Sequence, residues 1–146
     1  MDKIIPFPQA DDFQKVLKII NIANPDDLKQ KKSMQIILGD ITERQVQYYL
    51  NAVMFLGVID LNKNFTELGI KIRKMNKFEQ KIVLSQQIVS NKVFGEVYFS
   101  EKVLDIKFSK DEIVGVMKKY LKFQSEEIYY RRAQTILKWL EWVNNN

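Results

Sequence analysis

The stretch TERQVQYYLNAVMFLGVIDLNKNFTELG, residues 42–69, contains the signals from which the fold is predicted. Thr42 is followed three residues later by Gln45, which is the pattern of a capping box at the start of a helix. Apolar side chains then recur at helical spacing up to about Leu56, and Gly57 is a natural end for the helix. We therefore predict a helix over residues 42–56.

A short hairpin is predicted directly after this helix. Residues 58–66 are predicted to form a strand, a polar turn and a second short strand. The turn is expected at Asn62-Lys63-Asn64, because asparagine tolerates left-handed backbone angles. Thr66 is then a suitable cap for a helix that covers about residues 67–75.

The helix over residues 42–56 has two very different faces. One face is apolar and is formed by Val46, Tyr49, Leu50 and Val53. The opposite face is polar and is formed by Arg44, Gln47, Tyr48 and Asn51. Arginine binds guanine or phosphate, glutamine and asparagine bind adenine, and hydroxyl groups bind phosphate. The polar face therefore suits DNA, although a helix surface that is merely solvated also favours these residue types.

Upstream of the quoted stretch the chain is predicted to be helical. Helical spacing of apolar side chains predicts a helix over residues 11–23. Asn24 and Pro25 then suit the cap and first position of a short basic helix. A further helix is expected to end at Gly39, immediately before the quoted stretch.

Downstream, residues 76–94 are predicted to be helical, whereas residues 95–109 fit either a strand or a helix. Ser109 and Glu112 form a second capping-box pattern, which predicts a helix up to about residue 121. The last helix is expected to begin at Ser125 and to run almost to the end.

The last helix repeats the design of the helix over residues 42–56. RRAQTILK, residues 131–138, aligns with RQVQYYLN, residues 44–51, although the flanking elements do not keep the same offset. Its predicted inner face is apolar, and its predicted outer face is formed by Arg131, Gln134, Thr135 and Lys138. These side chains are again suited to DNA or to solvent. Aromatic side chains near these faces, Phe55 and Trp142, are expected to seal the two halves together or to contact a second copy.

The quoted stretch resembles the winged helix-turn-helix DNA-binding families, through LGVI, a hairpin wing and then TELG. RRAQTILKWLEWV is similar to the second winged-helix unit found in some bacterial restriction-modification-associated proteins. This resemblance implies a mainly α fold with small β-hairpin wings, built as a tandem winged helix-turn-helix. The implied units are residues 1–75 and a second helical, winged-helix-like unit, residues 76–146, packed on the first.

The resemblance also implies roles for particular residues. Arg44, Gln47, Tyr48 and Asn51 would enter the major groove of DNA. Lys31 and Lys32 lie on the preceding helix, where they would be beside phosphates. Lys63 is the single lysine of the implied wing, and wings that bind DNA often carry more basic residues. Arg131, Gln134, Thr135 and Lys138 would form the second set of contacts.

Charge supports a polyanionic partner. The net charge is +5, and it is uneven along the chain. Residues 1–69 carry 8 basic and 9 acidic side chains, whereas residues 70–146 carry 15 basic and 9 acidic side chains, so the second half alone has a net charge of +6. Lys71, Arg73, Lys74, Lys77 and Lys81 form the densest basic stretch. A basic surface of this kind either binds phosphates or only keeps the protein in solution.

Residue types that are missing limit the chemistry. The chain has no cysteine and no histidine, which removes disulfides, thiolate metal sites and the commonest general base. We find no Gly-rich phosphate loop, no GxSxG and no cluster of metal ligands. There is also no run of about 18 apolar residues that could span a membrane, and no signal peptide. We therefore expect a cytoplasmic protein without catalytic activity, cofactor or metal.

The predicted function is non-catalytic binding of double-stranded DNA. The chain would serve as a transcriptional regulator or as the DNA-recognition part of a restriction system. The alternative is a protein-protein interaction or oligomerisation module that uses the same fold. The sequence leaves open whether the chain forms a homodimer or belongs to a larger restriction-system chain.

Overall fold

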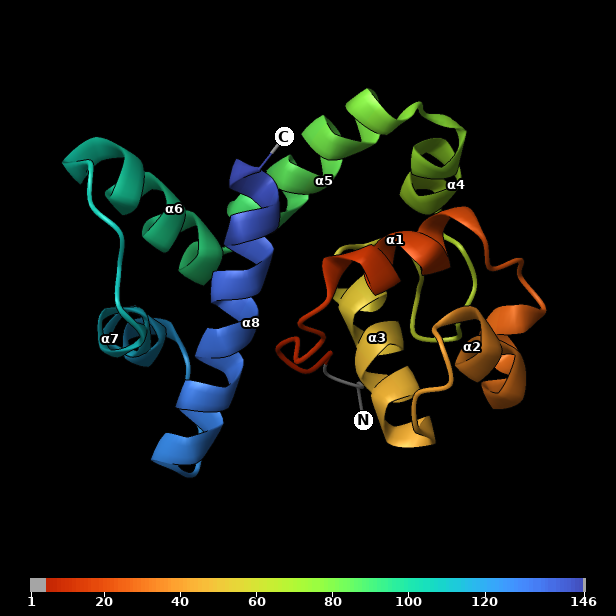
Figure 1. Cartoon of the computed structure of the whole chain (residues 1–146), viewed down its shortest axis with the longest axis horizontal. Helices are drawn as coiled ribbons and strands as arrows, with labels where there is room; N and C mark the ends of the chain where they lie inside the picture. The colour runs from red at the N-terminus through yellow and green to blue at the C-terminus, as the bar shows by residue number, and fades with distance from the viewer. Residues whose placement is uncertain (1–4, 146) are drawn as a thin grey trace.

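The computed structural model describes residues 5–145, and its regular elements in this range are all helices (Figure 1). One lobe contains the first three α-helices, the other contains the last three, and α4 and α5 connect them along one side. The elements are α1 (Phe13–Asn21), η1 (Asp27–Lys29), α2 (Lys31–Ile37), α3 (Glu43–Phe55), α4 (Glu67–Lys74), α5 (Lys77–Ser90), α6 (Lys92–Leu104), α7 (Lys110–Tyr120) and α8 (Glu126–Asn144).

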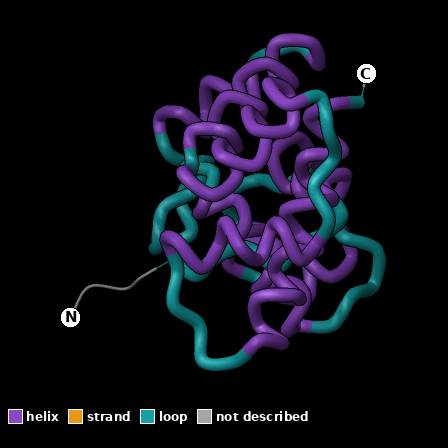
Figure 2. Tube along the Cα trace, turned by 90° about the vertical axis from the view of Figure 1, so that its left-hand side faces the viewer, coloured by secondary structure: helices purple, strands orange, loops and turns teal. Residues whose placement is uncertain are grey.

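The predicted β-hairpin wings are wrong. Residues 5–145 contain no strand (Figure 2), and only one isolated antiparallel bridge, between Ile59 and Phe65, occupies the place of the first wing. The bridge cannot extend because Thr66 already caps α4, and its hydroxyl also donates to the carbonyl oxygen of Val58. Before the turn, α3 ends at Phe55 with Leu56 as its C-cap, so few residues remain there for a strand. The fold is therefore all-helical.

Capping residues explain why the helices begin where they do. The predicted capping box of Thr42 and Gln45 is confirmed at the start of α3, and that of Ser109 and Glu112 is confirmed at the start of α7. Each box satisfies two backbone N–H groups that have no partner inside the helix. These local interactions made the boundaries predictable from sequence.

A close approach of two backbone segments requires the glycine of TELG. A Cβ atom at Gly69 would lie 2.0 Å from the carbonyl oxygen of Val58. Only glycine lets α4 lie this close to the segment that follows α3. Gly69 therefore positions α4 against the end of α3 even though no wing is formed.

The segment that fitted a strand or a helix is helical. A break at Asn91 separates α5 from α6, and the Asn91 side chain accepts hydrogen bonds from the N–H groups of Val93 and Phe94. The asparagine therefore starts a new helix where a single one was predicted over residues 76–94. The second half consists of α5 to α8 and has no wing in the described part of the chain.

An aromatic cluster joins the two halves. Trp139 of α8 is fully buried and lies 5.4 Å from Phe94 and 6.1 Å from Phe55, measured between ring centroids. Trp142 stacks on Phe13 of α1 at 4.1 Å. Aromatic pairs contribute about 0.5–1.5 kcal/mol beyond the area that they bury. Phe55 and Trp142 therefore seal the halves, as predicted from sequence.

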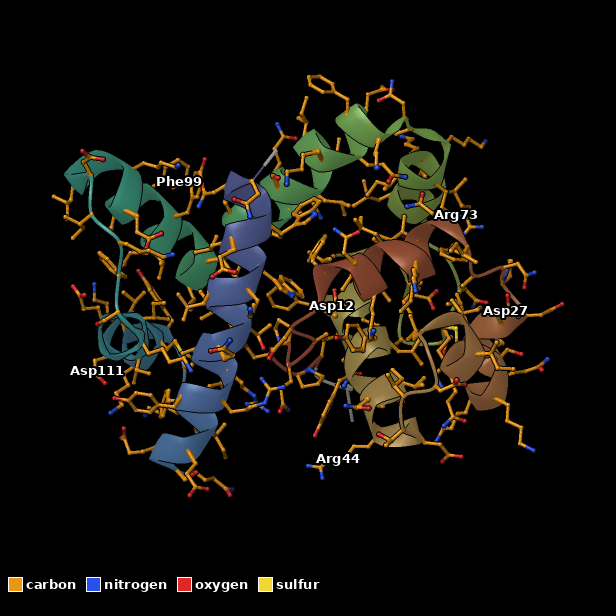
Figure 3. All side chains as sticks on the ribbon, viewed as in Figure 1. Asp12, Asp27, Arg44, Arg73, Phe99 and Asp111 are labelled. Atoms are coloured by element: carbon orange, nitrogen blue, oxygen red, sulfur yellow. The ribbon has the colours of Figure 1, made fainter. Side chains whose placement is uncertain are left out.

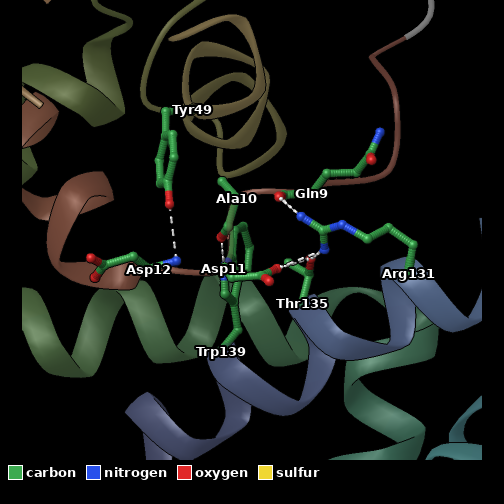
Figure 4. Close-up of polar contacts among 8 residues, drawn as sticks. All are labelled: Gln9, Ala10, Asp11, Asp12, Tyr49, Arg131, Thr135 and Trp139. Carbon is green, nitrogen blue, oxygen red and sulfur yellow. Dashed lines mark hydrogen bonds and ion pairs between the residues drawn. The ribbon is translucent and has the colours of Figure 1, made fainter. Parts of the chain in front are cut away.

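Residues 7–12, which we call the N-terminal strap, run between α3 and α8 (Figure 4). Phe7 packs against Phe94 with its ring centroid at 5.5 Å. The indole N–H of Trp139 donates to the carbonyl oxygen of Ala10 at 2.7 Å. At the end of the strap, the N–H of Asp12 donates to the hydroxyl of Tyr49 on α3 at 3.1 Å. The strap thus touches both halves.

The buried side chains of both halves belong to one cluster. The predicted division at residue 75 falls between α4 and α5, and the assignment of two units, the second packed on the first, stays a prediction. Within the described residues, none of the helices combines the length and the apolar character that crossing a membrane demands.

We predict that Thr42→Ala lowers the free energy of unfolding by about 0.5–2 kcal/mol, because it removes the side-chain cap of α3. Thr42→Ser is the matched control, since serine keeps the hydroxyl that accepts from the N–H of Gln45. The measurement is urea denaturation followed by circular dichroism. Equal stabilities of the alanine and serine variants would contradict the role of this cap.

The strap generates a second prediction. Thr135 is fully buried and donates its hydroxyl to the Asp11 carboxylate at 2.6 Å. Thr135→Val keeps the shape but removes this charge-assisted hydrogen bond, which is expected to cost about 1.5–3 kcal/mol. Gln134→Val, at the neighbouring half-buried position, is expected to cost less than about 1 kcal/mol. If both variants melt at the same temperature, the strap does not stabilise the fold through Thr135.

Candidate functional site

Parts of the polar faces of α3 and α8 meet at one pocket, to which Arg44, Tyr48 and Arg131 contribute. Side chains from the N-terminal halves of both helices and from the strap line one pocket of about 300 Å³. Its lining residues are Gln9, Arg44, Tyr48, Glu127, Ile128, Arg131 and Arg132. At the other end of α3, Phe55 is packed against Phe94 and Trp139. The aromatic cluster therefore closes the C-terminal end of the polar face and leaves the N-terminal half accessible.

On the α3 side, the predicted DNA-contacting residues form two pairs. Arg44 is exposed and donates from Nε to the Tyr48 hydroxyl at 2.6 Å. Figure 3 shows the Arg44 side chain in the space between α3 and the N-terminal half of α8. The second pair is half-buried, and the Gln47 amide donates to Asn51 at 2.9 Å. All four side chains lie on one face, as predicted.

On the α8 side, Arg131 holds the strap. Its guanidinium donates to the Asp11 carboxylate at 3.0 Å and to the carbonyl oxygen of Gln9 at 3.0 Å (Figure 4). These two contacts use both terminal nitrogens of the side chain. Arg131 lines the pocket, but in this arrangement it serves as a link between α8 and the strap, and its DNA contact stays a prediction.

The remaining predicted residues of α8 differ in their exposure and do not share one surface. Thr135 was expected on an outer face, but it is fully buried because the strap covers that flank of α8. Gln134 is half-buried, and Lys138 is exposed with its ammonium 4.0 Å from Glu141. Neither of these two lines the pocket with Arg44. The predicted set of α8 contacts is therefore not one continuous surface.

Sequence reasoning missed Arg132. Its Nε is buried and has no hydrogen-bond partner among residues 5–145, and its guanidinium carbon lies 4.5 Å from the centroid of the Phe123 ring. Burial lowers the pKa of Arg132; the Tyr48 hydroxyl raises it and the Arg131 charge lowers it further. The signal was present in the sequence, because Arg132 lies three residues after Tyr129 and four before Ile136, both on the apolar face.

The predicted lysines lie around α2 and the turn that replaces the wing. Lys31 pairs with Glu43 at 3.8 Å and so links the first residues of α2 and α3. Lys32 is exposed, and Lys63 is half-buried in the turn with a left-handed φ of 63°. Lys29 of η1 reaches the same turn and donates to Asn64 at 2.9 Å. These lysines remain candidates for phosphate contacts.

Two members of the basic stretch after residue 70 have structural roles. Arg73 donates to the carbonyl oxygens of Ile20 at 2.9 Å and Ala23 at 2.6 Å, so it caps the end of α1. Lys81 lies over the Trp142 ring with its ammonium 3.8 Å from the centroid, and burial lowers the pKa of Lys81. Their positive charges are therefore used inside the molecule and do not form a phosphate-binding row.

The pocket between α3 and α8 has the chemistry of an anion site. Three guanidinium groups and one carboxylate, Glu127, line it. Within residues 5–145, neither Arg44 nor Arg132 has a carboxylate at ion-pair distance. No group of three acidic, histidine or cysteine side chains that could hold a metal occurs in the same range. Planar guanidinium groups bind oxyanions through two parallel hydrogen bonds.

Comparison with known proteins identifies the family. Residues 15–146 match the family described as a domain of unknown function (DUF7226), and because this is most of the chain, the chain belongs to that family. No match was found among curated proteins or among solved structures.

The two neighbouring basic residues at the end of α4 allow a matched test. Arg73→Met should lower the free energy of unfolding by about 1.5–3 kcal/mol, because it leaves two backbone carbonyls without their charged donor. Lys74→Met removes the same charge from an exposed position, and its cost should stay within about 0.5 kcal/mol. Chemical denaturation measures both. A similar small effect of the two variants would show that Arg73 is not a structural cap.

Proposed function

We propose that this member of the DUF7226 family binds double-stranded DNA without catalysing a reaction on it. In this proposal the pair α2 and α3 acts like the helix-turn-helix of the families that the sequence resembles. The chain would work as a transcriptional regulator or as the DNA-recognition part of a restriction system, in the cytoplasm, alone, as a homodimer or within a larger assembly.

One observation carries the proposal. Arg44 and Arg132 come from different halves of the chain and line the same pocket, and neither is paired with a carboxylate in the described residues. Uncompensated guanidinium groups that converge from two helices favour a polyanion, because phosphate contacts supply most of the affinity for DNA.

The accessible part of α3 suits this use. Recognition helices contact base edges mainly with their N-terminal residues, and the N-terminal half of α3 is the part that the aromatic cluster leaves uncovered. Arg44 and Gln47 would contact base edges or phosphates there. Lys32 and Lys63 would contact phosphates on the flank formed by α2 and the following turn.

A second function is favoured by a different observation. Apolar side chains at the end of α6 are exposed, with 55% of Phe99, 81% of Val103 and 60% of Leu104 accessible to solvent. Exposed apolar groups of this kind are typical of protein-interaction surfaces. A protein-interaction or oligomerisation module is therefore the alternative, and it predicts little affinity for DNA at any salt concentration.

Binding to duplex DNA of random sequence tests the two functions. With about four phosphate contacts, the DNA proposal predicts a slope of roughly −3.6 in log affinity against log salt, or a roughly 100-fold loss for a fourfold rise in salt. Within this assay, Arg44→Ala with Gln47→Ala should weaken binding and reduce the slope by about 0.9, because Arg44 would supply one of the phosphate contacts. Fluorescence anisotropy gives both results.

The matched control is Gln14→Ala with Lys18→Ala on α1, where the same amide and one positive charge are removed from exposed positions. It should bind DNA like the unchanged protein. The melting temperatures of both double variants should stay close to that of the unchanged protein, since their side chains are not core residues. Absence of salt-dependent binding by the unchanged protein would refute the DNA proposal.

A further inference from the structure

Arg132 is the one residue of the pocket whose protein environment does not explain its position. Its Nε is buried and unpartnered within residues 5–145, although it belongs to the most strongly basic type of side chain. Its neighbour Arg131 shows the ordinary solution, since that guanidinium binds a carboxylate and a carbonyl oxygen. A buried N–H group without a partner costs free energy, because it loses its hydration without compensation.

Burial and the neighbouring Arg131 charge act against the Arg132 cation, whereas the face of the Phe123 ring attracts it. The Phe123 ring lies against the guanidinium, with 4.5 Å between the guanidinium carbon and the ring centroid. Burial lowers the pKa of Arg132, and repulsion by the Arg131 charge adds to this effect, although the Tyr48 hydroxyl opposes it. An anion placed here would offset these effects, since it would pair the half-buried charge.

Donors for such an anion come from both helices. Arg44 uses Nε for the Tyr48 hydroxyl, which leaves its two terminal nitrogens for a ligand. The Tyr48 hydroxyl accepts from Arg44, so its own proton is available to a ligand oxygen. The pocket volume of about 300 Å³ leaves space for a small oxyanion between the two helices. Glu127 also lines the pocket and disfavours an anion near the first turn of α8, so the ligand belongs beside Arg132.

We propose that the pocket between α3 and α8 binds a single phosphate group, with Arg132 as its half-buried anchor and Arg44 and Tyr48 as further donors. Two planar guanidinium groups and a hydroxyl match the oxygens of a tetrahedral phosphate. The inference rests on the proposed function in one respect: if the protein binds DNA, the phosphate group belongs to the DNA backbone. The same chemistry also fits a terminal phosphate or free phosphate, and the experiment distinguishes these sources.

The decisive variant is Arg132→Met, which keeps a long apolar side chain against Phe123 and removes the charge. Because Arg132 has no carboxylate partner within residues 5–145, the variant should melt close to the unchanged protein in buffer without phosphate. Lys107→Met is the charge-matched control, since Lys107 is exposed in the loop between α6 and α7.

The first measurement is thermal unfolding with inorganic phosphate, compared with chloride at equal ionic strength. Unchanged protein and the Lys107→Met control should gain roughly 2–4 °C once phosphate exceeds about four times its dissociation constant. Arg132→Met should gain nothing. An equal phosphate shift in Arg132→Met and in the control would overturn the inference.

The second measurement is anisotropy with two duplexes that differ only in a 5′-hydroxyl or a 5′-phosphate. If Arg132→Met loses about tenfold in affinity for both duplexes and its salt slope is reduced by about 0.9, the ligand is a backbone phosphate. If Arg132→Met loses affinity only for the 5′-phosphorylated duplex, the ligand of the pocket is a terminal phosphate.

The two proposals fail in different ways. If the unchanged protein binds neither duplex but Arg132→Met abolishes the phosphate shift, the pocket stands as a site for free phosphate and the DNA proposal fails. If the unchanged protein binds duplex DNA and Arg132→Met binds it with the same affinity and salt slope, the DNA proposal stands and the pocket inference is overturned. Marked destabilisation by Arg132→Met in phosphate-free buffer, together with an unaltered phosphate shift, would make Arg132 a purely structural residue.

Discussion

The packing of Trp139 against aromatic rings from both halves is the interaction on which the rest of the structure depends. Its ring is fully buried and lies near Phe13 and Phe55 of the first half and near Phe94 of the second. Its indole N–H also binds the strap through Ala10. A large aromatic side chain that buries its area and also satisfies its polar atom fixes position and orientation together. Its contact with Phe55 joins the C-terminal end of α3 to α8.

That arrangement decides which part of each polar face remains accessible. The rings close the space between α3 and α8 around Phe55, and the strap covers the flank of α8 around Thr135. Toward the N-terminal ends of both helices the side chains are arginine and tyrosine, which do not form a dry core, and a pocket remains. The same packing that stabilises the two halves therefore brings Arg44 and Arg132 together.

Three arginines illustrate how the surroundings set the role of one residue type. Arg73 binds two carbonyl oxygens at the end of α1, and Arg131 binds the carboxylate of Asp11, so both contribute to stability. Arg132 is half-buried, and its Nε is buried without a partner in the described residues. Strain of this kind is often retained at functional sites, since a ligand relieves it. We therefore assign the ligand to Arg132 and not to its neighbour.

The sequence by itself determined where α3, α4, α7 and α8 begin, because caps and capping boxes act between residues that are about three positions apart. Thr42, Thr66 and Ser109 were identified in this way. It also determined the amphipathic faces of α3, since Val46, Leu50 and Val53 share one side at helical spacing. These features need no information about distant parts of the chain.

Only the tertiary structure decided what covers each face. Thr135 looked like an outer residue until the strap, more than a hundred positions earlier in the chain, was placed against it. No wing forms because Thr66 caps α4 and does not continue a strand. Local residue spacing fits both a helix cap and a strand at this position, so it could not decide between them. Arg132 is half-buried because its guanidinium lies over the ring of Phe123, which belongs to the loop before α8. Burial of a side chain depends on contacts between elements that are remote in sequence, and helical periodicity contains no information on those contacts.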